Sequence, residues 1–201
     1  MIGCPLGRRR HPFIGSQVIA ALSRTQSRLI VVALVLGLFF WVFADAIFRD
    51  RNFCYRDAGH FYYPLLKLVQ DEWNAGRWPL WNPYENGGMP LLGNATSAVL
   101  YPPRVVIFQW LPISYATAYK WYTLLHVLMS AATAYSMVRN WKATELAAGL
   151  AAISYAFGAV VMFQYCNIIF LVGAAWVPLG ILATDRMLRD GSWRWAVGLG
   201  S

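Results

Sequence analysis

The sequence contains few charged residues for its length. Of its 201 residues, 17 are Lys or Arg and 9 are Asp or Glu. Charged residues therefore make up 13% of the chain, about half the share usual in a soluble domain. Hydrophobic residues make up 58%, and the mean hydropathy is +0.43. This composition excludes an ordinary soluble domain and places the chain among membrane proteins.

Cysteine is also scarce, and its spacing indicates no site. Cys4, Cys54 and Cys166 are far apart, odd in number and without metal-ligand spacing, so they predict neither a disulfide framework nor a metal centre. No repeat of fixed period is present, which argues against a repeat architecture. The net charge of +8 lies in short flanks between apolar runs, and no basic face or stacking motif accompanies it. We therefore expect no nucleic-acid partner.

The long apolar runs predict transmembrane helices. Residues 29–48 are apolar except for Asp45, and about twenty residues is the length needed to span a bilayer. Residues 116–138 form a second span. Residues 146–184 form an apolar run of about 39 residues, roughly twice a single span. A polar cluster near its middle predicts a tight turn between a third and a fourth helix; the cluster is Gln164, Tyr165 and Asn167.

The predicted fold class is an all-α polytopic transmembrane helical bundle, with a long external loop carrying interfacial helices between the first and second spans. Residues 116–201 would hold spans two to four and the start of a fifth, because 195–201 begin another apolar run. We expect the remaining helices of a longer parent chain to be partners. A signal peptide is the competing interpretation of the N-terminus, but its apolar run is too long for an h-region and no small-x-small cleavage site closes it.

The distribution of basic residues predicts the orientation. Residues 1–28 form a basic tail without acids, and placing it in the cytoplasm also puts residues 139–145 and 185–194 there. These three flanks hold ten of the 17 Lys and Arg residues: Arg8, Arg9, Arg10, Arg24, Arg28, Arg139, Lys142, Arg186, Arg189 and Arg194. Residues 49–115 would then be external. The expected location is the bacterial inner membrane, with membrane lipid as a partner.

The loop at 49–115 is too long to be a simple connection. Loops of this length are functional or disordered, and its many Trp, Tyr, Phe and Leu residues argue against disorder. Residues 57–76 have helical spacing, and Gly76 is a stop signal. This pattern predicts an interfacial amphipathic helix that starts as late as Pro64. Four apolar residues share one face: Phe61, Leu65, Leu68 and Val69. Leu65, Leu68 and Val69 are expected to face lipid or the bundle. Residues 77–103 read as turns and short extended pieces, and 105–111 as a second interfacial piece.

Asp57 is the first candidate for chemistry in this loop. It lies just past the first span, between Arg56 and His60. A carboxylate at a membrane surface can act as a general base toward an acceptor hydroxyl. Asp57 equally suits a helix N-cap, which would give it a purely structural role. His60 is a candidate for substrate binding.

Three basic residues near the outer interface could stabilise the charge on a phosphate leaving group. They are Arg56, Arg104 and Lys120. Snorkelling toward lipid headgroups is the alternative role for each. His126, inside the second span, is expected to be a satisfied group facing the bundle. No metal-ligand cluster is visible in the sequence.

The loop also resembles a known class. The matching stretches are Arg56-Asp57, Tyr62-Tyr63-Pro64, Gly76 to Tyr84 (GRWPLWNPY), Gly87 to Leu91 (GGMPL), Asn94, Tyr101-Pro102 and Ala174 to Leu179 (AAWVPL). With the order of elements, they resemble the GT-C class of membrane glycosyltransferases and, within it, bacterial YfhO-like membrane proteins. The match covers about residues 29–195, and the Pro-Leu-Trp-Asn-Pro run is its most specific part.

The resemblance implies a function. Members of the class transfer a sugar from a polyprenyl-phosphate donor on the outer face of the membrane, with a catalytic Asp in the first external loop. Asp57 occupies the matching position, and Asp45 is the second choice. Some members use a divalent metal as cofactor. The expected partners are a polyprenyl-phosphate-linked sugar and an envelope acceptor.

A non-catalytic membrane protein is the rival interpretation. A transporter should show inverted repeats and broken helices with polar groups at the midplane, and only His126 and the 164–167 cluster hint at this. A scaffold for envelope assembly would need no such groups.

The orientation can be tested by cysteine labelling. In a background without native cysteines, Asn94→Cys should react with an impermeant thiol reagent in intact cells. Lys142→Cys should react only after the cells are opened, because basic flanks stay in the cytoplasm. Protection at position 94 together with labelling at 142 would reverse the orientation.

Overall fold

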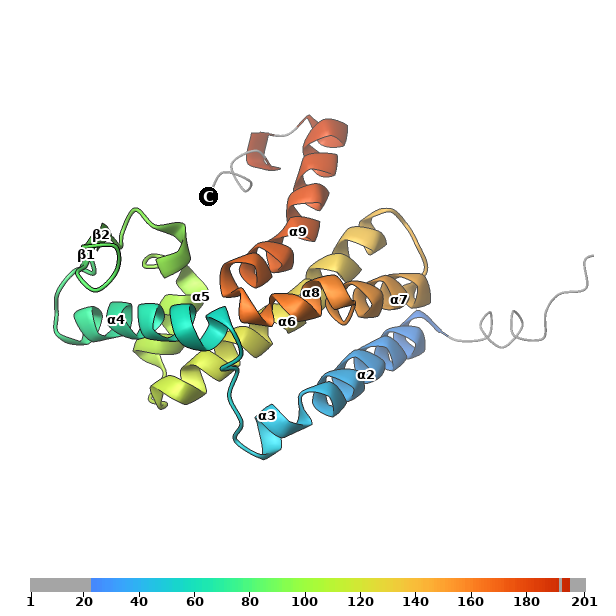
Figure 1. The fold of residues 1–201 in the computed structure, drawn as a ribbon. Coiled ribbons are helices and arrows are strands. Elements are labelled where there is room, and N and C mark those ends of the chain that lie inside the picture. The colour runs from blue at the N-terminus through green and yellow to red at the C-terminus, as the bar shows by residue number, and fades with distance from the viewer. Residues whose placement is uncertain (1–22, 192, 196–201) are drawn as a thin grey trace, which may run out of the picture.

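The computed structural model describes residues 23–191 and 193–195. In this part the chain is mostly helical, in agreement with the predicted all-α class (Figure 1). The long helices are α2 (Arg24–Val42), α6 (Tyr115–Asn140), α7 (Glu145–Ala156) and α9 (Ile168–Asp190). Most of the predicted basic tail (residues 1–22) and most of the predicted fifth run (196–201) lie outside the described residues.

Three helical stretches of the described chain are long and apolar enough to cross a membrane: Arg24–Val42, Glu145–Cys166 and Ile168–Asp190. By length and composition, these stretches indicate a membrane protein with a helical bundle. The predicted second span corresponds to α6, which is long enough at 26 residues but is not in this set. Buried polar residues such as Lys120, Thr123 and His126 give α6 its lower hydropathy. α6 lies at the centre of the bundle, in contact with α7 and α9.

The first predicted span is shifted and broken. Its helix starts at Arg24 instead of residue 29, because Ser23 accepts a hydrogen bond from the Gln26 amide while Gln26 bonds back to Ser23. The helix ends at Val42, and Phe43 leaves helical geometry before the short α3 (Ala44–Phe48). Asp45 therefore lies in a separate helical turn and not within a continuous span.

The predicted division of the run at 146–184 is confirmed. α7 is followed by α8 (Ala159–Phe163) and by η4, a 3₁₀ turn over Gln164–Cys166. Asn167 leaves helical geometry before α9 begins. α9 contains Pro178, and its ribbon bends partway along (Figure 1), as expected because an internal proline removes a backbone hydrogen bond.

Residues 49–114, here called the connecting segment, are folded. η1, a π-helical turn over Ala58–Tyr62, continues into α4 (Tyr63–Asn74), and Gly76 follows in the left-handed region with φ of +69°. The helix predicted within 57–76 and its stop are thus confirmed, but helical structure begins before Pro64. The remaining pieces are β1 (Trp81–Asn82) paired antiparallel with β2 (Met89–Pro90), η2 (Ala95–Ser97), α5 (Pro102–Val105) and η3 (Val106–Trp110).

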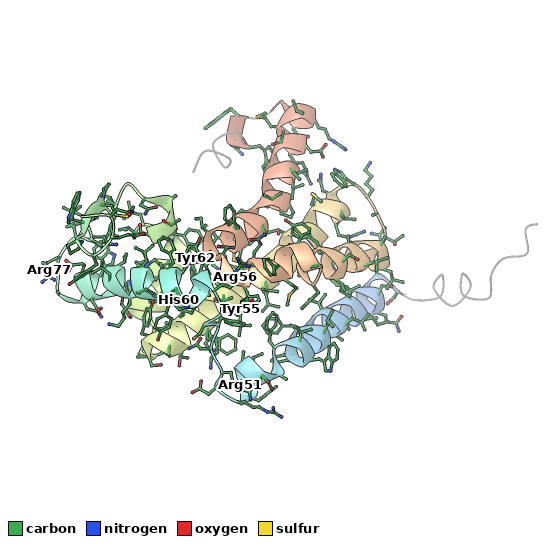
Figure 2. All side chains as sticks on the ribbon, viewed as in Figure 1. Arg51, Tyr55, Arg56, His60, Tyr62 and Arg77 are labelled. Carbon is green, nitrogen blue, oxygen red and sulfur yellow. The ribbon has the colours of Figure 1, made fainter. Side chains whose placement is uncertain are left out.

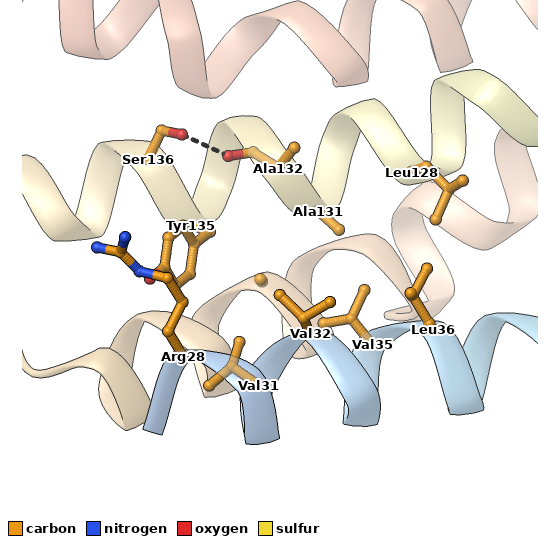
Figure 3. Close-up of a pocket in the computed structure, with 11 residues that line it drawn as sticks. Arg28, Val31, Val32, Val35, Leu36, Leu128, Ala131, Ala132, Tyr135 and Ser136 are labelled. Carbon is orange, nitrogen blue, oxygen red and sulfur yellow. Dashed lines mark hydrogen bonds between the residues drawn. The ribbon is translucent and has the colours of Figure 1, made fainter. Parts of the chain in front are cut away.

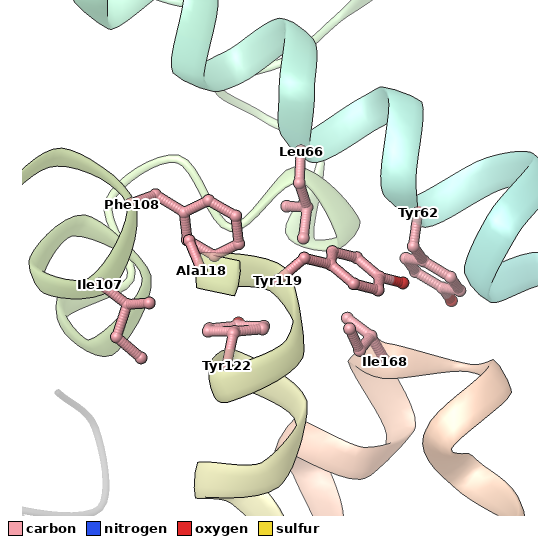
Figure 4. Close-up of a cluster of buried hydrophobic side chains, with 8 residues drawn as sticks. All are labelled: Tyr62, Leu66, Ile107, Phe108, Ala118, Tyr119, Tyr122 and Ile168. Atoms are coloured by element: carbon pink, nitrogen blue, oxygen red, sulfur yellow. The ribbon is translucent and has the colours of Figure 1, made fainter. Parts of the chain in front are cut away.

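One predicted face of α4 packs differently from expectation. Leu65 and Val69 are buried against Leu91 and Val99, which belong to the connecting segment itself. They face neither lipid nor the bundle. The neighbouring face contacts the bundle instead. There Tyr62 of η1 and Leu66 of α4 join a buried cluster with residues of η3, α6 and α9 (Figure 4). The segment has a small core of its own and is docked on α6.

The contact between α2 and α7 depends on small residues. α7 buries Ala148, Gly149, Ala152 and Ala156, and side chains of this size let helices approach closely within a membrane. A Cβ on Gly149 would lie 2.5 Å from a Val31 methyl group, so only glycine fits at this point.

This contact yields a matched pair of variants. Gly149→Ala should lower the thermal unfolding midpoint in detergent, because overpacking costs about 1–3 kcal/mol. Gly173→Ala should leave the midpoint unchanged or raise it, since a Cβ there meets nothing within 4 Å and alanine favours helix. Equal midpoints for the two variants would contradict the α2–α7 packing.

Candidate functional site

Asp57 lies at a sharp turn that joins the start of the connecting segment to η1. Arg56 has a φ of +53°, in the left-handed region, and its carbonyl accepts hydrogen bonds from the Gly59 and His60 amides, both at 3.1 Å. A Cβ on Gly59 would lie 2.5 Å from the Cys54 carbonyl oxygen. Glycine therefore allows the chain to fold back tightly enough to present Asp57 at the beginning of the helix.

The Asp57 carboxylate is exposed and free of structural partners. It occupies the N-cap position of η1, yet its side chain accepts no hydrogen bond from the helix. In the described part of the chain it takes part in no ion pair. The capping role that the sequence also allowed is therefore not realised, and the carboxylate is available to a ligand.

The surroundings of Asp57 come from two distant parts of the sequence. The Arg56 guanidinium lies 6.0 Å from the centre of the Phe163 ring, and the Phe53 and Tyr165 rings lie 5.8 Å apart. The start of the connecting segment thus packs against the turn between α8 and α9. Figure 2 shows Arg56, His60 and Tyr62 grouped where α4 begins, away from Arg51 beside α3 and Arg77 beyond the far end of α4.

Tyr62 is the buried member of this group. Burial, and to a smaller degree the negative charge of Asp57, raise the pKa of the Tyr62 phenol. Its hydroxyl group is therefore neutral at physiological pH. In the sequence, Tyr62 stands out only as part of the Tyr62-Tyr63-Pro64 motif, and its place beside Asp57 depends on the helix geometry.

His60 lines a cavity that is separate from the contact between Arg56 and Phe163. The cavity has a volume of about 280 Å³ and lies between α4 and the turn after β1. Its polar lining includes His60, Asn82, Tyr84 and Glu85, and the Asn82 amide donates to the Glu85 carboxylate at 3.3 Å. Tyr84 is 84% exposed, so an aromatic face is open to a ligand beside groups that form hydrogen bonds. The turns and short extended pieces predicted at 77–103 cover this region, but the pattern does not reveal the cavity.

Lys120 lies buried on α6 and is already paired. Its ammonium group is 2.6 Å from the Asp50 carboxylate, and its side chain is 6% exposed while that of Asp50 is 91% exposed. Two residues further on, the Asn52 side chain donates to the Ala116 carbonyl at 2.9 Å. Both contacts anchor the start of the connecting segment to the first turns of α6, so the predicted substrate contact at Lys120 would compete with this anchor.

Arg104 is completely buried in α5. One guanidinium nitrogen donates to the Val99 carbonyl at 3.4 Å, and the group lies 5.7 Å from the centre of the Phe108 ring. Nε and the second terminal nitrogen have no hydrogen-bond partner among the described residues. Burial lowers the pKa of Arg104 to about 10, so the group remains a cation at neutral pH. In this arrangement it reaches neither the surface nor Asp57, and its predicted phosphate contact would require the segment to open.

Asp45, the second candidate for a catalytic acid, is held by two cations. Its carboxylate oxygens each lie 3.1 Å from a guanidinium nitrogen, one from Arg49 and one from Arg51. This exposed cluster ends α3. Asp45 therefore has two cationic partners, whereas Asp57 has none among the described residues.

His126 is fully buried, and both ring nitrogens are hydrogen-bonded, which confirms the expectation of a satisfied group. Nδ1 is 2.7 Å from the Tyr122 carbonyl, which can only accept, so Nδ1 carries the proton. Nε2 then accepts from the Tyr101 hydroxyl at 2.9 Å, and that oxygen accepts from the Trp176 indole at 2.7 Å. This chain of bonds links the connecting segment, α6 and α9.

In the described part of the chain, no group of three or more His, Cys, Asp and Glu side chains is placed to hold a metal ion. A comparison with protein-family models, with curated proteins and with solved structures found no match for this chain. Its function must therefore be argued from the geometry above.

The Asp50–Lys120 anchor makes a prediction for stability. Asp50→Asn should lower the free energy of unfolding by about 1–3 kcal/mol, because it leaves a buried ammonium group unpaired; a fully buried pair would lose more. Lys120→Met should cost less, since it removes the charge and keeps the apolar stem. Denaturant unfolding in detergent measures both, and a larger loss for Lys120→Met would show that the pair is not the anchor.

Proposed function

We propose that the chain acts in glycosyl transfer on the outer face of the bacterial inner membrane, as a GT-C-like enzyme that uses a polyprenyl-phosphate-linked sugar and an envelope acceptor. One observation carries the proposal: Asp57 is an exposed carboxylate without a structural partner among the described residues, next to a cation and at the junction of two segments. The resemblance of the loop to that class supports it.

The proposed orientation is supported by the charges at the two ends of the bundle. Asp57 and the α8–α9 turn lie at one end. The other end contains the start of α2 and the last turn of α6, where Arg28 and Arg139 both form ion pairs with Glu145. Positive charge favours the cytoplasmic side, so the end with Asp57 would be external.

In the proposed reaction, Asp57 accepts the proton from an acceptor hydroxyl group. The acceptor oxygen forms a bond to the anomeric carbon, the bond from that carbon to the polyprenyl-phosphate oxygen breaks, and the phosphate leaves with the electron pair. Arg56, exposed beside Asp57, would stabilise the negative charge on the phosphate.

The other candidate residues take different parts in this proposal. The cavity at His60, with Tyr84 and Glu85, would bind polar groups of the acceptor. Lys120 would hold the segment in place through Asp50. A divalent metal remains a candidate cofactor through the resemblance alone.

Replacing the base tests the proposal. Asp57→Asn should reduce turnover of a polyprenyl-phosphate sugar by about 10²-fold or more, because the amide cannot accept the proton. Thermal stability should change little, since the carboxylate makes no cap bond. Transfer is measured with protein reconstituted in vesicles that contain the labelled donor.

Asp45→Asn is the matched control, and its turnover should stay within a few-fold of the parent. Equal turnover in Asp57→Asn and the parent would eliminate Asp57 as the base. If the parent chain shows no turnover, whether or not it binds the donor, this result would contradict the catalytic proposal. It would favour a transporter or a scaffold.

A further inference from the structure

A second polar site lies at the end of the bundle opposite Asp57. A cavity of about 540 Å³ is formed where α2 begins and where α6 turns into α7. Its charged lining consists of Arg24, Arg139, Lys142 and Glu145. Arg24 comes from α2, whereas Arg139 and Lys142 lie three residues apart where α6 ends, so the fold brings Arg24 to the other two cations.

This cavity, here called the basin, is lined by more cationic than anionic side chains. Glu145, only 5% exposed, lies 2.9 Å from an Arg139 nitrogen and 3.5 Å from an Arg28 nitrogen, and it also accepts a hydrogen bond from Tyr135. Arg24 and Lys142 are both exposed, and neither forms an ion pair within the described ranges. A bound anion would provide the missing negative charge.

An apolar groove begins beside the basin. It has a volume of about 290 Å³ and runs between α2 and α6 with one side formed by α7. Figure 3 shows Arg28 and Tyr135 at one end of the groove and Leu36 and Leu128 at the other. Between them the floor is built from small side chains, including Ala131, Ala132 and Ala152, which leave room for a hydrocarbon chain.

Arg28 and Tyr135 connect the two spaces. Both line the groove, and both contact Glu145, which lines the basin. α2 is apolar enough to span a membrane and starts at Arg24, so the basin lies at the membrane surface and the groove within the hydrocarbon. The arrangement matches an amphiphile with an anionic head and an apolar tail.

We propose that this end of the bundle binds one anionic phospholipid, with its phosphate in the basin between Arg24, Arg139 and Lys142 and one acyl chain in the groove between α2 and α6. Basic pockets between membrane helices bind anionic headgroups in this way. The site is separate from Asp57 and does not depend on the proposed transfer reaction.

Native mass spectrometry of the full 201-residue chain in detergent tests the headgroup. Dioleoyl-phosphatidylglycerol should bind at least tenfold more tightly than dioleoyl-phosphatidylcholine. The double variant Arg24→Gln/Lys142→Gln should weaken phosphatidylglycerol binding by about thirtyfold, given the usual contribution of each basic residue near a membrane surface.

Two controls decide whether the effect belongs to the basin. Arg189→Gln/Arg194→Gln removes the same charge at and beyond the end of α9 and should leave binding unchanged. Soluble glycerol 3-phosphate should compete poorly, because it lacks the acyl chain. Equal affinity for the two lipids, an equal loss in the control, or full competition by glycerol 3-phosphate would each overturn the proposal.

Filling the groove tests the acyl chain. Ala132 is exposed on α6 and lines the groove, so Ala132→Phe should occupy it and reduce phosphatidylglycerol binding at least tenfold without lowering the thermal midpoint. Ala147→Phe, at an exposed position on α7 outside the groove, is the matched control. Unchanged binding in Ala132→Phe would show that the groove is not occupied by lipid, as when another helix covers it.

Discussion

The polar groups buried on the first half of α6 constrain the rest of the structure. Within a membrane protein such groups are stabilised by internal partners, because no water is available to satisfy them. The connecting segment supplies partners for three side chains of α6. The Tyr119 hydroxyl donates to the Ala58 carbonyl at 2.9 Å, Tyr115 donates to the Tyr63 carbonyl, and Lys120 pairs with Asp50. These bonds fix where η1 begins, and Asp57 immediately precedes it. A helix too polar to count as a simple span is thus the platform on which the candidate site is built.

The two ends of the bundle offer opposite chemistry. One end presents an exposed carboxylate, Asp57, which forms no ion pair within residues 23–191 and 193–195, beside Arg56. The other gathers cations around a single buried acid, Glu145, next to an apolar groove. Between them, His126, Tyr101 and Trp176 form a neutral hydrogen-bonded chain that ties the connecting segment to α6 and α9. A protein that handles lipid-linked substrates at one surface and is held by lipid at the other would need this separation.

Much of the fold followed from patterns that act locally. Hydrophobic run lengths located the long helices, Asn167 marked the division before α9, and Gly76 ended the helix of the connecting segment. The break at Phe43 and the early start of α2 were missed, because the first depends on packing against other helices and the second on a capping pair inside the basic tail.

The site was harder to predict because its properties depend on contacts between distant residues. Asp57 was chosen from its position, but the absence of a cap bond to its carboxylate could be seen only in three dimensions. Spacing could not show that Lys120 is paired, since Asp50 lies 70 residues away. Nor could it show that Arg104 is buried, because burial depends on tertiary packing. The burial of Leu65 and Val69 against Leu91 and Val99 was likewise invisible, because an amphipathic pattern identifies a buried face but not what covers it.

The bonds to α6 hold the connecting segment on the bundle, so that Asp57 has a fixed place beside the α8–α9 turn. Spin labels at two exposed positions, Asn74→Cys on α4 and Val160→Cys on α8, test it most directly in a cysteine-free background. Electron–electron double resonance in lipid nanodiscs should give one narrow distance distribution. A broad distribution, as from a loop that moves freely over the membrane surface, would contradict the account.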